Sequence, residues 1–213
     1  GGSPGPYVFV HMVRMAAAPR ALAFSPMGAP PGDAPRQALS GDDTRPQVTA
    51  TPRLTPLQID GRLDERDWAS APVSAPFVQG EPVEGAAVDQ PTTVRVLFDG
   101  QALYIGARLH DVSPDQVRRQ LSRRDEFGPF DFFDVSLSPN NDRLTGYRFR
   151  VSAAGVQSDW YLYDDTRDDI SWDAVWDVQV SRDAEGWRAE FRIPFSQLRF
   201  NGASGGPVGF AVV

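Results

Sequence analysis

The strongest constraint on this chain is a period of two in its hydrophobic residues, which begins near residue 57. The alternation runs through residues 93–98, stops at Asp99 and Gly100, and resumes over residues 103–110. Successive side chains of a β-strand point to opposite faces, so this pattern predicts two half-buried strands. An Asp-Gly pair between two such strands is typical of a hairpin turn.

Two further pairs of alternating segments follow, within residues 131–153 and residues 174–195. In the last pair, Trp176 and Trp187 fall on the apolar phase, so both are predicted to face the core. Helical patterns are few and short. They cover residues 113–121 and residues 63–70, where Trp68 is predicted to close one side of the core.

These patterns predict an all-β fold, namely a two-sheet antiparallel β-sandwich of the immunoglobulin-like or jelly-roll type with one or two short helices. Ten of the 19 prolines fall in residues 1–56, and every tryptophan falls after residue 60. Because such a segment buries too little apolar surface to offset its chain entropy, residues 1–56 are predicted to be a Pro/Gly/Ala-rich, disordered leader or linker. The sandwich domain is assigned to residues 57–213, and it ends within an apparent strand, as a domain cut from a longer protein would.

Composition excludes several classes of function. The net charge of −7 and an isoelectric point near 4.8 argue against a nucleic-acid surface, which needs clustered Lys and Arg. The chain has no cysteine, which rules out a disulfide framework, a thiolate zinc site and a cysteine nucleophile. No apolar run reaches the roughly 18 residues of a transmembrane helix. No phosphate-binding loop, dinucleotide fingerprint or nucleophile elbow is present, so no catalytic residue is predicted.

Residues 158–177, "SDWYLYDDTRDDISWDAVWD", combine aromatic and acidic side chains at unusual density. Sugar-binding modules stack the apolar face of a pyranose on an aromatic ring and bond its hydroxyls with neighbouring polar side chains. Loops and strand ends carried by a rigid sandwich are where such contacts concentrate. The candidate ligand-binding residues are therefore Trp160, Tyr161, Tyr163 and Trp172, with local packing as the competing interpretation.

The same stretch offers a candidate calcium site. Calcium takes six to eight oxygen ligands, and Asp164, Asp165, Asp168 and Asp169 could supply several of them. The spacing lacks the glycine and closing glutamate of an EF-hand. A hydrated loop whose like charges repel one another is the alternative, and a bound calcium ion would relieve that repulsion.

Several segments together resemble a known family. They are "IDGRLDERDW" at residues 59–68, "SWDAVW" at residues 171–176 and "GWRAEFRIPFSQLRF" at residues 186–200. In this order they look like the carbohydrate-binding module family 9-like domain found at the N-terminus of a group of bacterial proteins of unknown function. The resemblance covers roughly residues 57–213.

The resemblance implies export to the periplasm or the outer-membrane-associated cell envelope, and a C-terminal β-rich region of the full-length protein as a partner. By analogy it implies an oligo- or polysaccharide ligand, although fold alone does not determine function. The expected function is a noncatalytic carbohydrate-binding-like module, stabilised by calcium if the acidic stretch binds it. The alternative is a structural or interaction sandwich that docks on the C-terminal region without binding sugar. A glycoside hydrolase is a third hypothesis, but the sequence singles out no pair of carboxylates for it.

Overall fold

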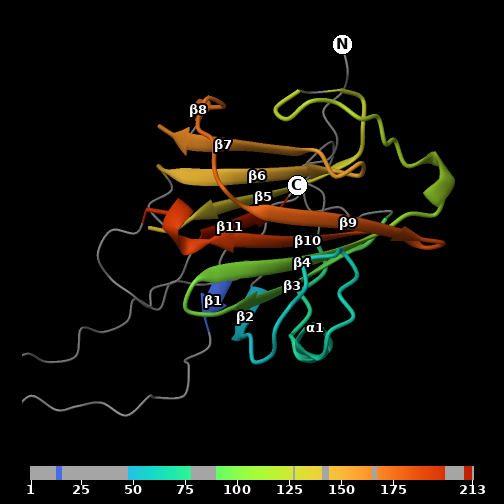
Figure 1. Cartoon of the computed structure of the whole chain (residues 1–213), viewed down its shortest axis with the longest axis horizontal. Coiled ribbons are helices and arrows are strands. Elements are labelled where there is room, and N and C mark those ends of the chain that lie inside the picture. The colour runs from blue at the N-terminus through green and yellow to red at the C-terminus, as the bar shows by residue number, and fades with distance from the viewer. Residues whose placement is uncertain are drawn as a thin grey trace, which may run out of the picture.

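Two β-sheets packed face to face form the body of the molecule (Figure 1). The computed structural model describes residues 48–77, 90–126, 128–140, 144–164 and 167–199, and the backbone of residues 13–15 and 209–212. The six-stranded sheet has the order β1 (Val13–Met15), β2 (Val48–Pro52), β3 (Thr92–Phe98), β4 (Ala102–His110), β10 (Gly186–Pro194) and β9 (Asp177–Asp183). The five-stranded sheet has the order β11 (Gly209–Val212), β5 (Phe132–Ser138), β6 (Gly146–Ser152), β7 (Gln157–Tyr163) and β8 (Arg167–Asp169).

The predicted β-sandwich is confirmed, and its three hairpins pair in the expected antiparallel sense. Val96 of β3 lies opposite Ile105 of β4, and Val178 of β9 lies opposite Phe191 of β10. Strands β5 and β6 pair in the same way. The helices are short: α1 (Arg66–Ser70) and the 3-10 turns η1 (Pro114–Gln116) and η2 (Phe195–Gln197). In the described part of the chain, no helix is long and apolar enough to cross a membrane.

One edge of the six-stranded sheet departs from the expected antiparallel pattern. Strand β1 pairs with β2, and β2 pairs with β3, in parallel. Both strands fall within residues 1–56, which the sequence assigned to a leader. Val48 and Ala50 of β2 are almost fully buried in the core. A five-residue strand is too short to alter the average composition of a proline-rich segment, and Pro52 occupies the strand end, where proline is tolerated.

The main core lies between the two sheets and is rich in aromatic rings. Phe191 stacks on Trp176 with ring centroids 5.6 Å apart and an interplanar angle of 4°. Phe149 meets Trp176 edge-on at 5.3 Å, and Phe133 meets Phe191 edge-on at 5.9 Å. Trp187 is also buried in this cluster. The prediction that Trp176 and Trp187 face the core is therefore confirmed.

A smaller apolar layer covers the outer face of the six-stranded sheet, where α1 packs beneath β3 and β4 (Figure 1). Trp68 is 1% exposed and packs with Leu97 and Tyr104. Its indole Nε1 donates to Glu190 Oε1 at 2.9 Å, and the fully buried Glu190 also accepts from the backbone N–H of Gly61 at 2.8 Å. Trp68 thus closes one side of the fold, as predicted, but on the outer face of a sheet rather than between the sheets.

Candidate functional site

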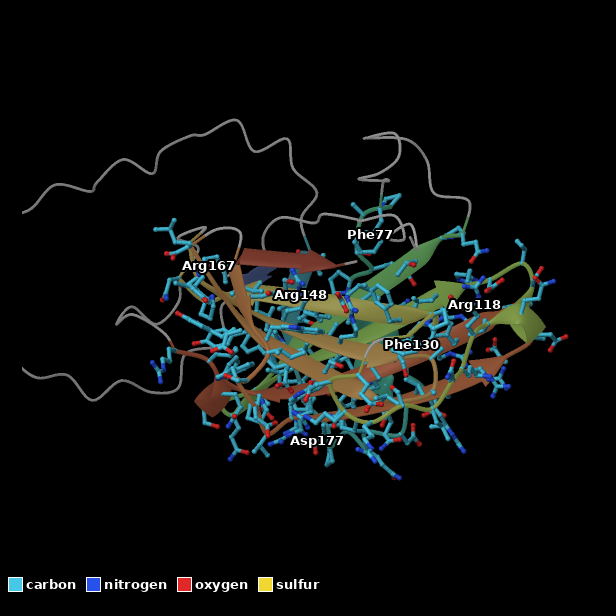
Figure 2. All side chains as sticks on the ribbon, turned by 90° about the horizontal axis from the view of Figure 1, so that it is seen from above. Phe77, Arg118, Phe130, Arg148, Arg167 and Asp177 are labelled. Atoms are coloured by element: carbon cyan, nitrogen blue, oxygen red, sulfur yellow. The ribbon has the colours of Figure 1, made fainter. Side chains whose placement is uncertain are left out.

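A groove lies on the outer face of the five-stranded sheet and follows from the register of its strands. Arg148 of β6 lies opposite Trp160 of β7, and Leu162 of β7 lies opposite Asp168 of β8. Directly paired residues share a face, so these side chains project away from the core. Figure 2 looks down on this face, with Arg148 near its middle. The groove has a volume of about 330 Å³, and the described residues that line it are Arg148, Arg150, Trp160, Asp168 and Ile170.

Trp160 forms the floor of the groove and is only 4% exposed. The guanidinium carbon of Arg148 lies 5.7 Å from its ring centroid, and that of Arg150 lies 5.1 Å away. Cations at this distance are attracted by the negative face of an indole. The ring therefore positions two arginines, and it offers little free surface for a sugar to stack on.

Arg150 has a carboxylate partner inside the sheet. Asp134 of β5 lies directly opposite it, and Arg150 Nε and Nη2 each donate to one Asp134 oxygen at 2.6 Å. Asp134 is 2% exposed, and burial raises its pKa even though the charges of Arg150 and Arg148 act in the opposite direction. Asp134 and Arg150 therefore form a structural ion pair within the sheet.

Arg148 has no carboxylate directly opposite it on β5. The β5 residue opposite it is Ser136, which carries no charge. Its Nε is buried, and within the described ranges it has no hydrogen-bond partner. A buried donor without a partner costs roughly 1–3 kcal/mol of folding free energy. Among the described lining residues of the groove, Arg148 carries this cost.

Three of the four predicted ligand-binding aromatics lie together at the rim of the sandwich. Tyr161 and Tyr163 are stacked, with centroids 6.0 Å apart and an interplanar angle of 13°. Tyr147 links them to Trp172, because its ring lies 5.4 Å from Tyr161 and 4.9 Å from Trp172. We call Tyr147, Tyr161, Tyr163 and Trp172 the rim cluster. Tyr161, Tyr163 and Trp172 are partly exposed, and Tyr161 and Trp172 also pack against the core.

Trp160 does not join the rim cluster. It follows the opposite phase of β7 from Tyr161 and Tyr163, so its ring lies on the other face of the sheet. The alternation rule applied to residues 157–163 would have separated Trp160 from the two tyrosines. The four predicted aromatic residues therefore lie in two places: Trp160 in the groove, and the other three in the rim cluster.

The four predicted calcium ligands are also divided. Asp168 lies opposite Leu162, whereas Asp169 lies opposite Tyr161, so the two carboxylates leave β8 on different faces. Asp169 Oδ1 accepts from Ser171 Oγ at 2.6 Å and from its backbone N–H at 2.9 Å, and these bonds lower the pKa of Asp169.

Asp164 is in the left-handed region with φ 50°, and Asp165 lies outside the described residues. No group of three or more His, Cys, Asp or Glu side chains that could hold a metal ion occurs in the described part of the chain. Calcium binding by Asp164, Asp165, Asp168 and Asp169 stays a prediction. It would require Asp168 and Asp169 to turn toward a common ion.

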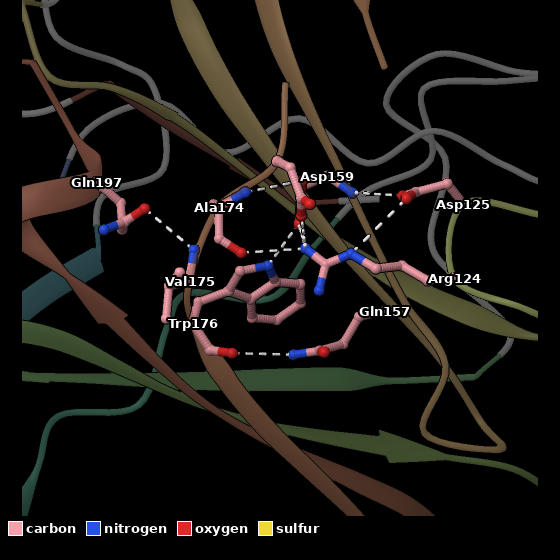
Figure 3. Close-up of polar contacts among 9 residues, drawn as sticks. Arg124, Asp125, Gln157, Asp159, Ala174, Val175, Trp176 and Gln197 are labelled. Carbon is pink, nitrogen blue, oxygen red and sulfur yellow. Dashed lines mark hydrogen bonds and ion pairs between the residues drawn. The ribbon is translucent and has the colours of Figure 1, made fainter. Parts of the chain in front are cut away.

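A buried carboxylate that the sequence analysis did not single out, Asp159, connects the first residues of the acidic stretch to Ala174 and Trp176 near its end (Figure 3). Asp159 is 1% exposed and forms an ion pair with Arg124. Trp176 Nε1 donates to Asp159 Oδ2 at 2.7 Å, and the Ala174 N–H donates to Oδ1 at 3.3 Å. Burial raises the pKa of Asp159, and the Trp176 and Arg124 contacts oppose that rise. Arg124 also forms an ion pair with Asp125, with its Nε 3.7 Å from Asp125 Oδ2.

Three of the buried acids have structural partners that hold them away from the groove. Asp134 is held by Arg150, Asp159 by Arg124 and Trp176, and Glu190 by Trp68 and backbone amides. None of these three carboxylates lines the groove. A glycosidase needs two carboxyl groups about 5–10 Å apart across a substrate cleft, and the groove contributes Asp168 alone among its described lining residues.

Comparison with known proteins finds likeness at the level of structure. Neither a protein-family model nor a curated protein sequence matches the chain. A family 9 carbohydrate-binding module of Caldicellulosiruptor kristjanssonii, solved in complex with cellotriose, is 19% identical with a TM-score of 0.50, over 76% of this chain and 73% of that one. The same kind of module from this organism, in complex with glucose, gives 19% identity and a TM-score of 0.50 over 76% and 75%.

A protein of Bacteroides uniformis, named only provisionally as carbohydrate-binding, is 16% identical with a TM-score of 0.52 over 68% of this chain and 72% of that one. At these identities the likeness concerns the fold. The chain has a β-sandwich similar to that of carbohydrate-binding module family 9, as its sequence motifs led us to expect.

Proposed function

We propose that the chain is a noncatalytic carbohydrate-binding module and that its site is the groove over Trp160. The observation that carries the proposal is the combination, in one groove, of an arginine without a hydrogen-bond partner at Nε, a carboxylate and an apolar side chain: Arg148, Asp168 and Ile170. A sugar hydroxyl can accept from a guanidinium and donate to a carboxylate. The C–H face of the sugar ring can rest on the partly apolar surface of Ile170.

The size of the groove suits a short piece of an oligosaccharide. Pockets for small molecules have volumes of about 300–1,000 Å³, and this groove of about 330 Å³ is at the lower end of that range. The family 9 modules with a similar fold are in complex with glucose and cellotriose. Those two ligands support a saccharide of one to a few rings as the first class to test.

Affinity electrophoresis in gels that contain neutral or acidic polysaccharides tests the proposal. We expect slower migration of the wild-type chain in at least one polysaccharide, and loss of that retardation in Asp168→Asn. The matched control is Asp115→Asn, which removes one negative charge from an exposed residue of η1 outside the groove. Normal migration of the wild-type chain in every polysaccharide would contradict a carbohydrate-binding function.

The rim cluster stays a predicted second surface for sugar, and the same gels test it. Tyr161 and Tyr163 present partly exposed, stacked rings, but Trp172 also packs edge-on against Phe149 at 5.9 Å. If Trp172→Ala abolished the retardation and Asp168→Asn left it intact, the rim would be the site and the groove would not.

We also propose the cellular setting that the sequence resemblance implies. The full-length protein would be exported to the periplasm or the outer membrane, and its C-terminal β-rich region would contact this domain. Fractionation of cells that express the full-length protein tests the location. If the domain bound no sugar but bound the purified C-terminal region in trans, the structural alternative would replace the carbohydrate-binding proposal.

A further inference from the structure

Arg148 and Arg150, two residues apart on β6, both line the groove but lie opposite different residues of β5. Arg150 lies opposite Asp134, which it holds through two parallel bonds of 2.6 Å. Arg148 lies opposite Ser136 on β5 and Trp160 on β7. Among the described residues, the buried Nε of Arg148 has no hydrogen-bond partner. The fold therefore places a carboxylate directly opposite one arginine, and leaves its neighbour opposite an uncharged serine, with the longer-range charge of Asp134 acting on it.

The chemistry of the Arg148 guanidinium indicates which ligand group it could bind. A guanidinium carries five N–H donors in a planar fork that matches the two oxygens of a carboxylate. The Arg150–Asp134 pair shows this match on the same strand of the same sheet. A carboxylate that entered the groove would give Arg148 the partner that Asp134 gives Arg150.

The remaining lining limits what can carry that carboxylate. Asp168 lines the same groove and repels a bare anion, but it can accept hydrogen bonds from hydroxyl groups. Ile170 is 40% exposed and offers an apolar surface beside it. A sulfate ion has no hydroxyl donor for Asp168, and neither sulfate nor phosphate has an apolar face for Ile170. A sugar ring with one carboxylate has all three features.

We infer that the groove is selective for uronate residues of acidic oligosaccharides, with the uronate carboxylate bound by Arg148 and ring hydroxyls by Asp168. This inference rests on the proposed carbohydrate-binding function and adds the class of sugar to it. Neutral saccharides would use the hydroxyl contacts alone.

Calorimetric titration of the full chain tests the selectivity. The ligands are tri-uronates of galacturonate, glucuronate and mannuronate, each paired with its carboxyl-reduced neutral counterpart. We expect at least one tri-uronate to bind about tenfold or more tightly than its neutral counterpart, because a charge-assisted bidentate pair contributes on the order of 1.4 kcal/mol or more. The preference should weaken as salt is raised from 50 mM to 500 mM (roughly 13 Å to 4 Å in screening length).

Three variants locate the effect. Arg148→Gln should abolish the preference for the tri-uronate. Because the glutamine amide can still donate to a sugar hydroxyl, the affinity for the neutral ligand should fall much less than the affinity for the tri-uronate. Arg148→Lys keeps the charge but lacks the planar fork, so it should keep only part of the preference. Arg119→Gln removes the charge of an exposed arginine outside the groove and should change nothing. A melting temperature equal to that of the wild type shows that a variant which loses the preference for the tri-uronate is still folded.

The outcomes separate the inference from the function on which it rests. Equal or tighter binding of the neutral ligands by the wild type would overturn uronate selectivity and leave the carbohydrate-binding proposal intact. A preference that survives in both Arg148 variants would also overturn it. If sodium acetate at the same concentration displaced the tri-uronate, the groove would be a general anion site, and uronate selectivity would be overturned as well. Absence of binding to every saccharide would remove both proposals.

Discussion

Asp159 is the acidic residue of the aromatic stretch whose removal should cost the most stability. Its carboxylate is 1% exposed, pairs with Arg124, accepts from Trp176 Nε1 at 2.7 Å and accepts from the Ala174 N–H at 3.3 Å. Removing one partner of a buried ion pair costs about 3–5 kcal/mol, because the other partner is left unsatisfied. Arg124 is 37% exposed and can recover some water, so we expect Asp159→Ala to lower the free energy of unfolding by about 3 kcal/mol.

An isosteric change separates the charge from the hydrogen bond. The amide oxygen of Asp159→Asn can still accept from Trp176, so we expect a smaller loss of about 1–2 kcal/mol. Asp173→Ala is the matched control, because Asp173 also pairs with Arg124, at 2.8 Å, but is 78% exposed. Exposed pairs contribute about 0–1 kcal/mol, so this control should unfold almost as the wild type does.

Urea unfolding followed by tryptophan fluorescence measures these differences, since Trp176 itself reports on the site. The comparison uses the transition midpoint and its slope, so that a change in denatured-state compactness is recognised. If Asp159→Ala unfolded within 1 kcal/mol of Asp173→Ala, the argument that burial makes this carboxylate structurally important would be wrong.

Two further predictions concern the six-stranded sheet. Burial alone would raise the pKa of Asp99, but hydrogen bonds from backbone amides and Arg53 lower it from 3.8 to about 2. The ionised carboxylate therefore contributes about 2 kcal/mol to the free energy of unfolding above pH 4, and this contribution is lost as the pH falls toward 2. Urea unfolding of Asp99→Asn should therefore show a lower stability at pH 5 and a flatter dependence between pH 4 and 2 (roughly the window set by the two pKa values). Gly61 has φ +82° and its added Cβ would lie 2.8 Å from the Val180 carbonyl carbon, so Gly61→Ala should lose more than about 1 kcal/mol. Gly100→Ala, with open space around the added methyl, should show no comparable shift in thermal unfolding.

Most of the fold could be predicted because each sheet buries its inner face in the main core, and this imposes a period of two on the hydrophobic residues of the strands. The same rule placed Trp176 and Trp187 in the core and located the three hairpins. It could not identify strand β2, because a partner in parallel pairing lies far along the chain and leaves no turn motif beside it. Val48 and Ala50 alternate correctly, but three residues of alternation inside a proline-rich segment carry too little information.

The candidate site was predictable only in its ingredients. Trp160 was predicted to bind sugar and Asp168 to bind calcium, and the two residues line one groove. The contribution of Arg148 depends on which β5 residue lies opposite it. A shift by one residue would exchange Ser136 for a buried neighbour, and the long connection between β5 and β6 does not fix that register from sequence.

The acidic and aromatic residues of 158–177 occur together because the sandwich uses them in separate places. Asp159 points inward and holds the indole N–H of Trp176, just as Glu190 holds that of Trp68 on the other sheet. A tryptophan can be buried only if its N–H finds an acceptor, and a carboxylate can be buried only if it gains donors, so each makes the other's burial less costly. Asp168 leaves β8 on the outer face of the sheet and lines the groove. The acidic and aromatic residues of this stretch therefore contribute both to the core and to the candidate surface site, because the pleat of β7 and β8 sends alternate side chains to opposite faces.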